Sequence, residues 1–272
     1  MSNSSAPAIY LEKINKSFKT AQKPVQVLNN ISLTVDEGDF LIIFGPSGCG
    51  KSTLLHVILG LEPPTSGNQV KVLGNQIYAG LKTNQGWFDE DDAAEFRKEH
   101  IGMVYQQTYW IKSQNVVQNV AFPLLLLGES ELKAASKAKQ VLESVGMLDW
   151  SEYIPTELSS GQQQRVNLAR ALITNPEILI TDEPTGNLDF QSGQELMEML
   201  VKLNKAGKTI IMVTHDLEYL PYATKAAEMF DGSIKGVYTG QEKKNILKNL
   251  RTKKVELVGW EEKTKNNHFW LV

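Results

Sequence analysis

The fold of this chain is decided by one stretch, Gly45-Pro46-Ser47-Gly48-Cys49-Gly50-Lys51-Ser52-Thr53. It satisfies the pattern G-x-x-x-x-G-K-[ST], in which glycines let backbone N–H groups converge on a polyanion. The run before it, Phe40–Phe44, is apolar and of strand length, and Lys51–Gly60 after it carries apolar residues at helical spacing. A buried strand, a glycine loop and a helix predict an α/β unit that binds phosphate.

The residue types in this loop indicate a nucleoside triphosphate with a metal ion. Lys51 is suited to reach the β- and γ-phosphates, and the Ser52 hydroxyl is suited to ligate Mg²⁺. Average residue usage produces the pattern by chance in roughly 1% of chains of this length, and the flanking strand and helix lower that further. Cys49 stands at a variable position of the pattern, so we interpret it as a small filler rather than a nucleophile.

Two adjacent acids follow a second apolar strand, Ile178–Thr181. Alone, such a pair most often caps a helix or lies in a solvated turn. Ligands of parallel sheets gather at the carboxyl ends of strands, however, and a phosphate loop is present. We therefore expect Asp182 to lie beside Mg²⁺ and Glu183 to activate water.

Composition and charge limit the class of protein. The 272 residues are 42% hydrophobic and 22% charged with a net charge of −3, which predicts a folded chain of one large or two small domains. A single cysteine excludes a disulfide framework, and the apolar runs are shorter than the roughly 20 residues that cross a bilayer. We expect a soluble, cytoplasmic protein. Residues 235–272 carry a net charge of +5, which is more often a solvated face than a contact to nucleic acid or lipid.

The rest of the chain alternates strands and helices, which favours a mostly parallel sheet. Ala8–Leu11 and Ile31–Val35 have the alternation of half-exposed antiparallel strands. Asn75–Asp92 is expected as a surface excursion that leads into a helix at Ala93–Glu99. The further expected strands are Ile101–Tyr105 and Thr209–Thr214, and the further expected helices are Gly161–Asn175, Gln191–Asn204 and two helices within 115–146 that flank the proline-marked patch Pro123–Leu127.

Several further motifs resemble those of the ATP-binding cassette family of transporter ATPases. Leu158-Ser159-Ser160-Gly161-Gln162 is similar to the family signature, and Asn187-Leu188-Asp189 is similar to its D-loop. His215 follows a strand as the switch histidine does. Gln106 matches the Q-loop glutamine, with Gln107 leaving a one-residue ambiguity. The resemblance covers residues 8 to about 234, in family order.

This resemblance implies a fold and a mechanism. The expected fold is an α/β phosphate-loop NTPase core with an antiparallel β subdomain and an inserted α-helical subdomain at about 107–168. Residues 1–234 would form the ATPase domain and 235–272 a basic extension. Two copies would pair head to tail, with each ATP between the phosphate loop of one and Ser159, Ser160, Gly161, Gln162 and Asp189 of the other.

The resemblance also implies a role for each site residue. Glu183 would be the general base, His215 would hold the γ-phosphate and the attacking water, and Gln106 would sense Mg²⁺. Phe18 is the best match to the aromatic residue that stacks on adenine, with Tyr10 as its rival. The expected cofactors are therefore ATP and Mg²⁺.

Narrower features resemble the ATPases for lipoprotein release, macrolide export and cell division. A separately encoded membrane subunit would contact approximately Thr108–Asn119, and the protein would be peripheral on the cytoplasmic side of the membrane; no nucleic acid is expected. The alternative is a cassette that drives transmembrane signalling or envelope remodelling without transport. Two departures stand out: Ser160 replaces the first signature glycine, and 79–99 is about eight residues longer than usual.

Overall fold

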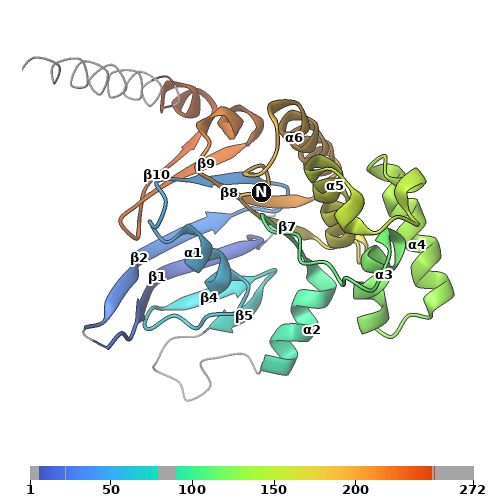
Figure 1. Cartoon of the computed structure of the whole chain (residues 1–272). Coiled ribbons are helices and arrows are strands. Elements are labelled where there is room, and N and C mark those ends of the chain that lie inside the picture. Colours follow the sequence, from blue (N-terminus) through green and yellow to red (C-terminus); the bar gives the residue numbers. More distant parts are fainter. Residues whose placement is uncertain (1–5, 22, 79–89, 247, 249–272) are drawn as a thin grey trace, which may run out of the picture.

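The computed structural model describes residues 6–21, 23–78, 90–246 and 248 (Figure 1). Two sheets organise these residues. Strands β2 (Val25–Val35), β1 (Ile9–Phe18), β4 (Gln69–Val72) and β5 (Asn75–Tyr78) form an antiparallel sheet in that order. The six-stranded sheet has the order β10-β9-β3-β8-β7-β6. Its strands are β3 (Phe40–Phe44), β6 (Ile101–Tyr105), β7 (Ile178–Asp182), β8 (Thr209–Thr214), β9 (Lys225–Phe230) and β10 (Ser233–Thr239).

The five strands from β9 to β6 run parallel, and only β10 pairs antiparallel at one edge. Parallel strands place all their carboxyl ends at one edge of the sheet, where a ligand can meet several loops at once. The phosphate loop follows β3, the acids end β7, and His215 follows β8, so the strand order β3-β8-β7 makes these three loops neighbours. The mostly parallel α/β sheet predicted from the sequence is confirmed.

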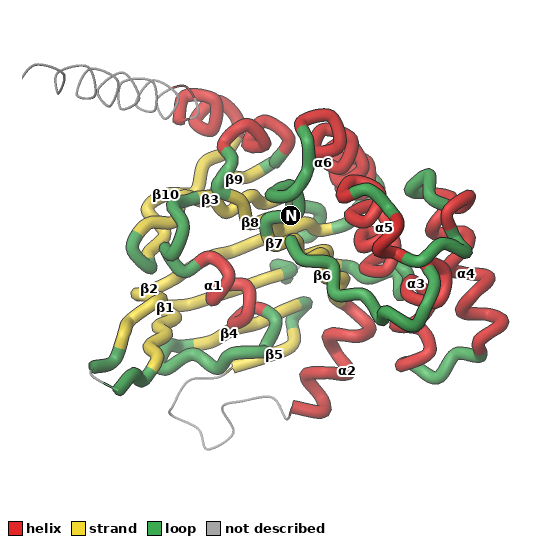
Figure 2. The backbone as a smooth tube through the Cα atoms, in the orientation of Figure 1, coloured by secondary structure: helices red, strands yellow, loops and turns green. Residues whose placement is uncertain are grey.

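Strand β3 is buried on both faces because two layers cover it. Phe40, Ile42 and Phe44 pack with the larger core cluster, while Leu41 and Ile43 pack with the second. The larger cluster holds α3 (Val116–Leu126), α4 (Glu131–Ser144), α5 (Ser160–Leu172), α6 (Phe190–Lys205) and the 3₁₀ turn η3 (Leu217–Tyr222). The second holds α1 (Lys51–Ile58) and the antiparallel sheet. Figure 2 shows α1 beside the antiparallel strands and α3–α5 on the other side of the molecule.

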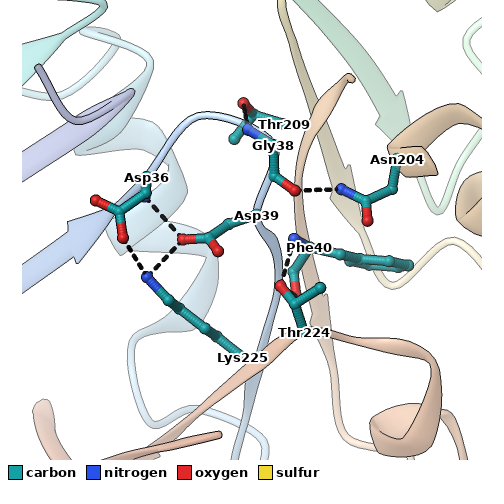
Figure 3. A network of polar contacts seen from close by, with 8 residues as sticks. All are labelled: Asp36, Gly38, Asp39, Phe40, Asn204, Thr209, Thr224 and Lys225. Atoms are coloured by element: carbon teal, nitrogen blue, oxygen red, sulfur yellow. Dashed lines mark hydrogen bonds and ion pairs between the residues drawn. The ribbon is translucent and has the colours of Figure 1, made fainter. Parts of the chain in front are cut away.

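A polar network fixes the end of β3 that lies farthest from the phosphate loop (Figure 3). Lys225 Nζ lies 2.6 Å from carboxylate oxygens of both Asp36 and Asp39. Burial opposes its charge, but the hydrogen bonds to Asp36 and Asp39 outweigh burial and raise the pKa of the ammonium. The remaining contacts run from Gly38 to Thr209 and Asn204 and from Phe40 to Thr224. They tie the start of β3, at the end away from the loop, to β8, β9 and α6.

The structure corrects three details of the sequence prediction. Asn75–Tyr78, expected as part of a surface excursion, is strand β5 and pairs with β4. Pro123, expected to separate two helices, lies inside α3. A proline there costs one backbone hydrogen bond, but α3 is stabilised in two other ways, since Asn115 caps its start and its buried face packs in the core. Strand β10 extends to Thr239, so the sheet includes the first five residues of the expected 235–272 extension.

Helix α2 (Glu90–His100) contains the helix predicted at Ala93–Glu99 and begins in the acidic run that precedes it, as expected for carboxylates at a helix N-terminus. The rest of the 79–99 insertion, through residue 89, lies outside the described residues. After β10 the chain continues as helix from Gly240 to Ile246. Figure 1 shows this helix at the opposite end of the molecule from α2. Within the described chain, no helix combines the length and apolarity that a bilayer span requires.

Candidate active site

The phosphate loop is shaped by glycines where the backbone leaves no room for a side chain. A Cβ on Gly45 would lie 2.0 Å from the carbonyl oxygen of Met229, and one on Gly50 would lie 2.7 Å from that of Val27. Gly50 also has φ 101° and forms the N-cap of α1, a conformation that favours glycine. The loop is thus packed between β9 and β2, and it leads into the positive end of the α1 dipole.

Lys51 is buried, and its ammonium turns back over the loop. Its Nζ donates to the carbonyl oxygens of Gly45 and Pro46, both at 2.9 Å, and lies 4.0 Å from the sulfur of Cys49. Burying a lysine is costly unless its donors are satisfied, and these two carbonyls satisfy them. The positive charge is therefore held within the curve of the loop, where a polyphosphate would lie.

The end of β7 brings an acid to the phosphate loop. Ser52 Oγ donates to Asp182 Oδ1 at 3.4 Å, although the two residues are 130 positions apart. Burial is the largest influence on Asp182 and raises the pKa of its carboxyl; the Ser52 hydrogen bond opposes this rise, and the charge of Glu183 adds to it. A hydroxyl and a partly desolvated carboxylate side by side are oxygen ligands that fit Mg²⁺. With Mg²⁺ bound, the ion would neutralise phosphate charge; Ser52 and Asp182 would hold it.

Glu183 stands in a strained backbone conformation beside His215. Its φ is 46°, in the left-handed region that non-glycine residues rarely adopt, and its N–H donates to the carbonyl of Val213 at 2.9 Å. The Glu183 carboxylate lies 3.0 Å from His215 Nδ1. Such strain persists only where the surroundings fix it, and it is common at functional sites. Both side chains line a cavity of about 290 Å³ that opens to solvent.

Gln106 directly follows β6, whose last residue, Tyr105, pairs with Asp182. A Cβ on Gly186 would lie 2.7 Å from the Gln106 amide nitrogen, so the turn after the two acids packs directly on this side chain. Gln107 also lines the adjoining cavity of about 400 Å³. Of the two glutamines, Gln106 is the one that directly follows the strand partner of Asp182.

The signature sequence forms the start of α5. Ser159 is the N-cap: its hydroxyl accepts from the Gln162 N–H at 3.3 Å, and the Gln162 side chain accepts from the Ser159 N–H at 2.9 Å. This reciprocal capping box fixes the first turn. Ser159 and Ser160 are exposed, and α5 packs on the face of the six-stranded sheet opposite α1. The phosphate loop leads directly into α1. Within one chain, the signature therefore lies on the side of the sheet opposite α1.

The D-loop is joined to the signature through one serine. Asp189 caps α6, since its carboxylate accepts from the Ser192 N–H at 2.9 Å and from the Ser192 hydroxyl at 2.8 Å. These hydrogen bonds lower the pKa of the Asp189 carboxyl. A Cβ on Gly161 would lie only 2.6 Å from the same hydroxyl oxygen. Glycine at 161 is thus required by the close approach of α6.

Four polar side chains of α5 form hydrogen bonds to the last residue of β6 and to the segment that follows it. Gln163 Oε1 accepts from Trp110 Nε1 at 2.9 Å and from the Thr108 hydroxyl at 3.2 Å, and its amide donates to the Leu158 carbonyl at 3.0 Å. Arg170 donates to the Tyr109 carbonyl at 2.7 Å and lies 4.7 Å from the centre of the Trp110 ring. Gln164 and Asn167 both donate to the Tyr105 carbonyl. The sequence did not indicate this role for any of the four residues, because regularly spaced polar residues on a helix are typical of a face exposed to solvent.

Phe18 and Tyr10 lie at opposite ends of β1. Phe18 pairs with Val25, two residues before Val27, whose carbonyl abuts Gly50 of the phosphate loop. Tyr10 pairs with Thr34, eight residues away along the strand, or about 26 Å in an extended chain. Phe18 therefore has the position near the loop, and the residue is 37% exposed.

Comparison with known proteins agrees with this geometry. The family model described as ABC transporter matches residues 28–186. The uncharacterized ABC transporter ATP-binding protein MJ1508 of Methanocaldococcus jannaschii is 41% identical over 226 residues, covering 83% of this chain and 97% of that protein. The lipoprotein-releasing system ATP-binding protein LolD of Colwellia psychrerythraea is 37% identical over 231 residues, covering 85% and 86%.

Among solved structures, a dimeric post-hydrolysis state of the ATP-binding cassette MJ0796, bound to ADP and Pi, is similar. It has a TM-score of 0.76 and 33% identity, and the match covers 85% of this chain and 98% of that one. The fold and the phosphate site thus define an ATP-binding cassette, an enzyme that hydrolyses ATP. The chain belongs to the ABC transporter family, and it is the ATP-binding subunit that energises a membrane transporter.

Proposed function

We propose that this subunit works in an exporter or extractor whose membrane subunits are encoded separately, on the cytoplasmic side of the membrane. The single observation that carries the catalytic part is the meeting of Ser52, Asp182, Glu183 and His215 at the ends of three neighbouring strands. The similarity to LolD, named as the ATP-binding protein of a lipoprotein-releasing system, supports an extractor with further subunits.

In this proposal the chain's residues divide the work of hydrolysis. Lys51 and the loop N–H groups bind the β- and γ-phosphates, while Ser52 and Asp182 hold Mg²⁺. Glu183 accepts the proton of the attacking water, and His215, hydrogen-bonded to it, orients the carboxylate and the γ-phosphate. Gln106, packed on the turn after the acids, lies where it would respond to the metal.

The second half of the site would come from another copy of the chain. Ser159, Ser160 and Gly161 begin a helix whose N-terminus is exposed, and such a terminus attracts phosphate. Because α5 lies across the sheet from α1, one chain does not bring this terminus to its own α1. A head-to-tail dimer with ATP between the two chains satisfies both halves, and the similarity to a dimeric cassette supports it.

The membrane subunit would dock at Thr108–Asn119. This segment borders a groove of about 290 Å³ between α2, α3 and α5, lined by Tyr109, Phe122 and Pro123 among others. Tyr109 is 67% exposed, which is a large value for an aromatic residue. The lining also includes the basic side chains of Lys98 and Arg170, and a groove that is partly apolar and partly basic fits the side of a short amphipathic helix. Gln118, exposed and neutral, adds no charge preference at the edge of the segment.

The test of the catalytic assignment is Glu183→Gln. Glutamine keeps the size and the hydrogen bond to His215 but removes the base, so Mg²⁺-dependent hydrolysis should fall by about 10²- to 10⁴-fold. ATP binding should persist, so the variant should elute as a dimer with ATP and as a monomer with ADP. Turnover near that of the wild type would refute the role of Glu183.

The docking assignment is tested on the complex. The tagged full chain is purified from a detergent extract of its own cells, and the co-purifying membrane protein is identified. Tyr109→Asp should abolish that co-purification while leaving the ATPase rate of the isolated chain within twofold. Retention of the membrane protein by this variant would contradict docking at Thr108–Asn119.

A further inference from the structure

Near the end of β1 lies a buried lysine to which the phosphate chemistry gives no role. Lys16 is 7% exposed, and its Nζ donates to Glu62 Oε2 and to the carbonyl of Pro63, both at 2.7 Å. Lysines are almost never buried unless paired. The ion pair and the carbonyl thus fix the ammonium at one point in space, instead of leaving it to move on a flexible stem.

That fixed charge lies over the ring of Phe18. Lys16 Nζ is 4.8 Å from the ring centre, inside the range of about 6 Å at which a cation is attracted to an aromatic face. Phe18 is nevertheless 37% exposed. One face is therefore held by the lysine, and an open part of the ring is left to stack on a flat partner.

Both residues pair with the part of β2 that contacts the phosphate loop. Lys16 pairs with Leu28 and Phe18 with Val25 on β2. The Leu28 side chain approaches to 3.2 Å of the point where a Cβ on Gly50 would lie. A base attached to a polyphosphate in that loop would therefore meet this end of β1 and β2.

We propose that Lys16 is a positioning residue for the nucleotide base: it holds the Phe18 ring in the orientation that stacks on adenine. This rests on the proposed function, in which Phe18 is the stacking residue. Lys16 itself does not read the base, because its donors go to Glu62, Pro63 and the ring. Its effect is to order an exposed side chain before binding, and ordering one such side chain is worth about two- to tenfold in a dissociation constant.

A bracing role alone is the alternative, since Lys16 also joins β1 to the segment after α1. The two roles differ in what they do to a ligand without a base. A brace that shaped the loop would affect inorganic pyrophosphate and ADP alike. A residue that positions the ring would affect ADP alone, and only while the ring is present.

The experiment titrates the full-length chain with ADP and with inorganic pyrophosphate by calorimetry. Lys16→Met should weaken ADP binding about two- to tenfold and leave pyrophosphate binding unchanged. Phe18→Ala should weaken ADP more, since stacking on an aromatic side chain is worth about five- to a hundredfold per base. In the Phe18→Ala background, Lys16→Met should have no further effect on ADP. Lys16→Arg, which keeps a cation near the ring, should recover most of the affinity.

Lys225→Met is the matched control, because Lys225 is also a partly buried, ion-paired lysine but lies at the opposite end of β3 and contacts no ring in the described chain. It should leave both ligands unaffected. Should Lys16→Met unfold the chain, Glu62→Gln loosens the anchor with Lys16 in place and should weaken ADP binding in the same selective way.

The outcomes distinguish the stacking role of Phe18 from the positioning role of Lys16. If Phe18→Ala changes ADP and pyrophosphate binding equally, Phe18 is not the stacking residue and the inference falls with it. If Phe18→Ala is selective for ADP but Lys16→Met acts equally on both ligands, or equally in the presence and absence of the ring, Lys16 is only a brace. Only a selective effect of Lys16→Met that vanishes without the ring supports the positioning role.

Discussion

Replacing Gly161 by alanine tests whether the signature helix depends on its contact with α6. The added Cβ would lie 2.6 Å from the hydroxyl oxygen and 2.9 Å from the Cβ of Ser192, against about 3.5–4.0 Å for an ordinary contact between carbon atoms. Ser192 cannot turn away freely, because its hydroxyl donates to Asp189 at 2.8 Å. The overlap should therefore move α5 or break the cap of α6.

The change in stability follows from two contributions. Overpacking of this kind costs about 1–3 kcal/mol in unfolding free energy. Alanine in a helix offsets up to about 1 kcal/mol of that, since it orders more readily than glycine. Gly161→Ala should therefore lower the free energy of unfolding by about 1 kcal/mol. For a chain of this length, that change lowers the melting temperature by about 2–4 °C. A shift of the helix terminus by a fraction of an ångström should slow ATP hydrolysis about ten- to a hundredfold.

The assay is a double-mutant cycle with Ser192→Gly, read by thermal melting and by steady-state ATPase rate. Without the Ser192 side chain the overlap is gone and only the helix preference remains, so Gly161→Ala should then stabilise the chain. This reversal of sign isolates the contact. Ser160→Ala, one residue away and exposed, is the control and should stay within about 0.5 kcal/mol of the wild type. If Gly161→Ala shifts the melting temperature equally in both backgrounds, the contact with α6 is not what requires glycine at 161.

Two further predictions concern the strand that ends in the acids. The hydroxyl of Thr181 is buried with no hydrogen-bond partner among the described residues, so Thr181→Val should raise the unfolding free energy by about 1 kcal/mol; a lower midpoint in denaturant would contradict this. Burial raises the pKa of Asp182 above its value in the unfolded chain, so the folded state binds the extra proton and its stability falls as pH rises through that pKa. Asp182→Asn should therefore raise the melting temperature of the nucleotide-free chain at neutral pH and flatten its pH dependence above pH 4, while Mg²⁺-dependent hydrolysis is lost. A steeper pH dependence in the variant would show that Asp182 is not the group responsible.

The parts of the fold that the sequence predicted are those whose signals are local. Phe40–Phe44 is apolar throughout because both faces are covered, and the loop that follows is defined by glycines within nine residues. The acids after Ile178–Thr181 belong to the same class, since strand and acids are contiguous. Strand β9 escaped notice because its run Lys-Ala-Ala-Glu-Met-Phe has little β-branched character, and its pairing with β3 makes it a strand.

Contacts between distant residues could not be predicted in this way. Lys16 and Glu62 are 46 positions apart, and no pattern in either segment indicates a buried ion pair, because lysine on a strand normally faces solvent. Gln163 and Trp110 are separated by 53 positions. The family resemblance indicated that the signature and the Q-loop both matter, but it gave no reason to connect them.

The structure supplies that connection, and it explains why a shift at either end of α5 would be felt at the other. The helix carries the signature on its first turn and, along its side, Gln163 and Arg170, which hold the segment proposed to meet the membrane subunit. A regular α-helix of 13 residues, held by its i→i−4 hydrogen bonds, moves as a unit. If docking displaces Thr108–Asn119, these two side chains must either break their hydrogen bonds to that segment or carry α5 along. The N-terminus of α5 at Ser159 is exposed, so it can follow such a movement. Transport and hydrolysis would then be coupled by one rigid element, and the glycine at 161 would mark the point where that element turns against α6.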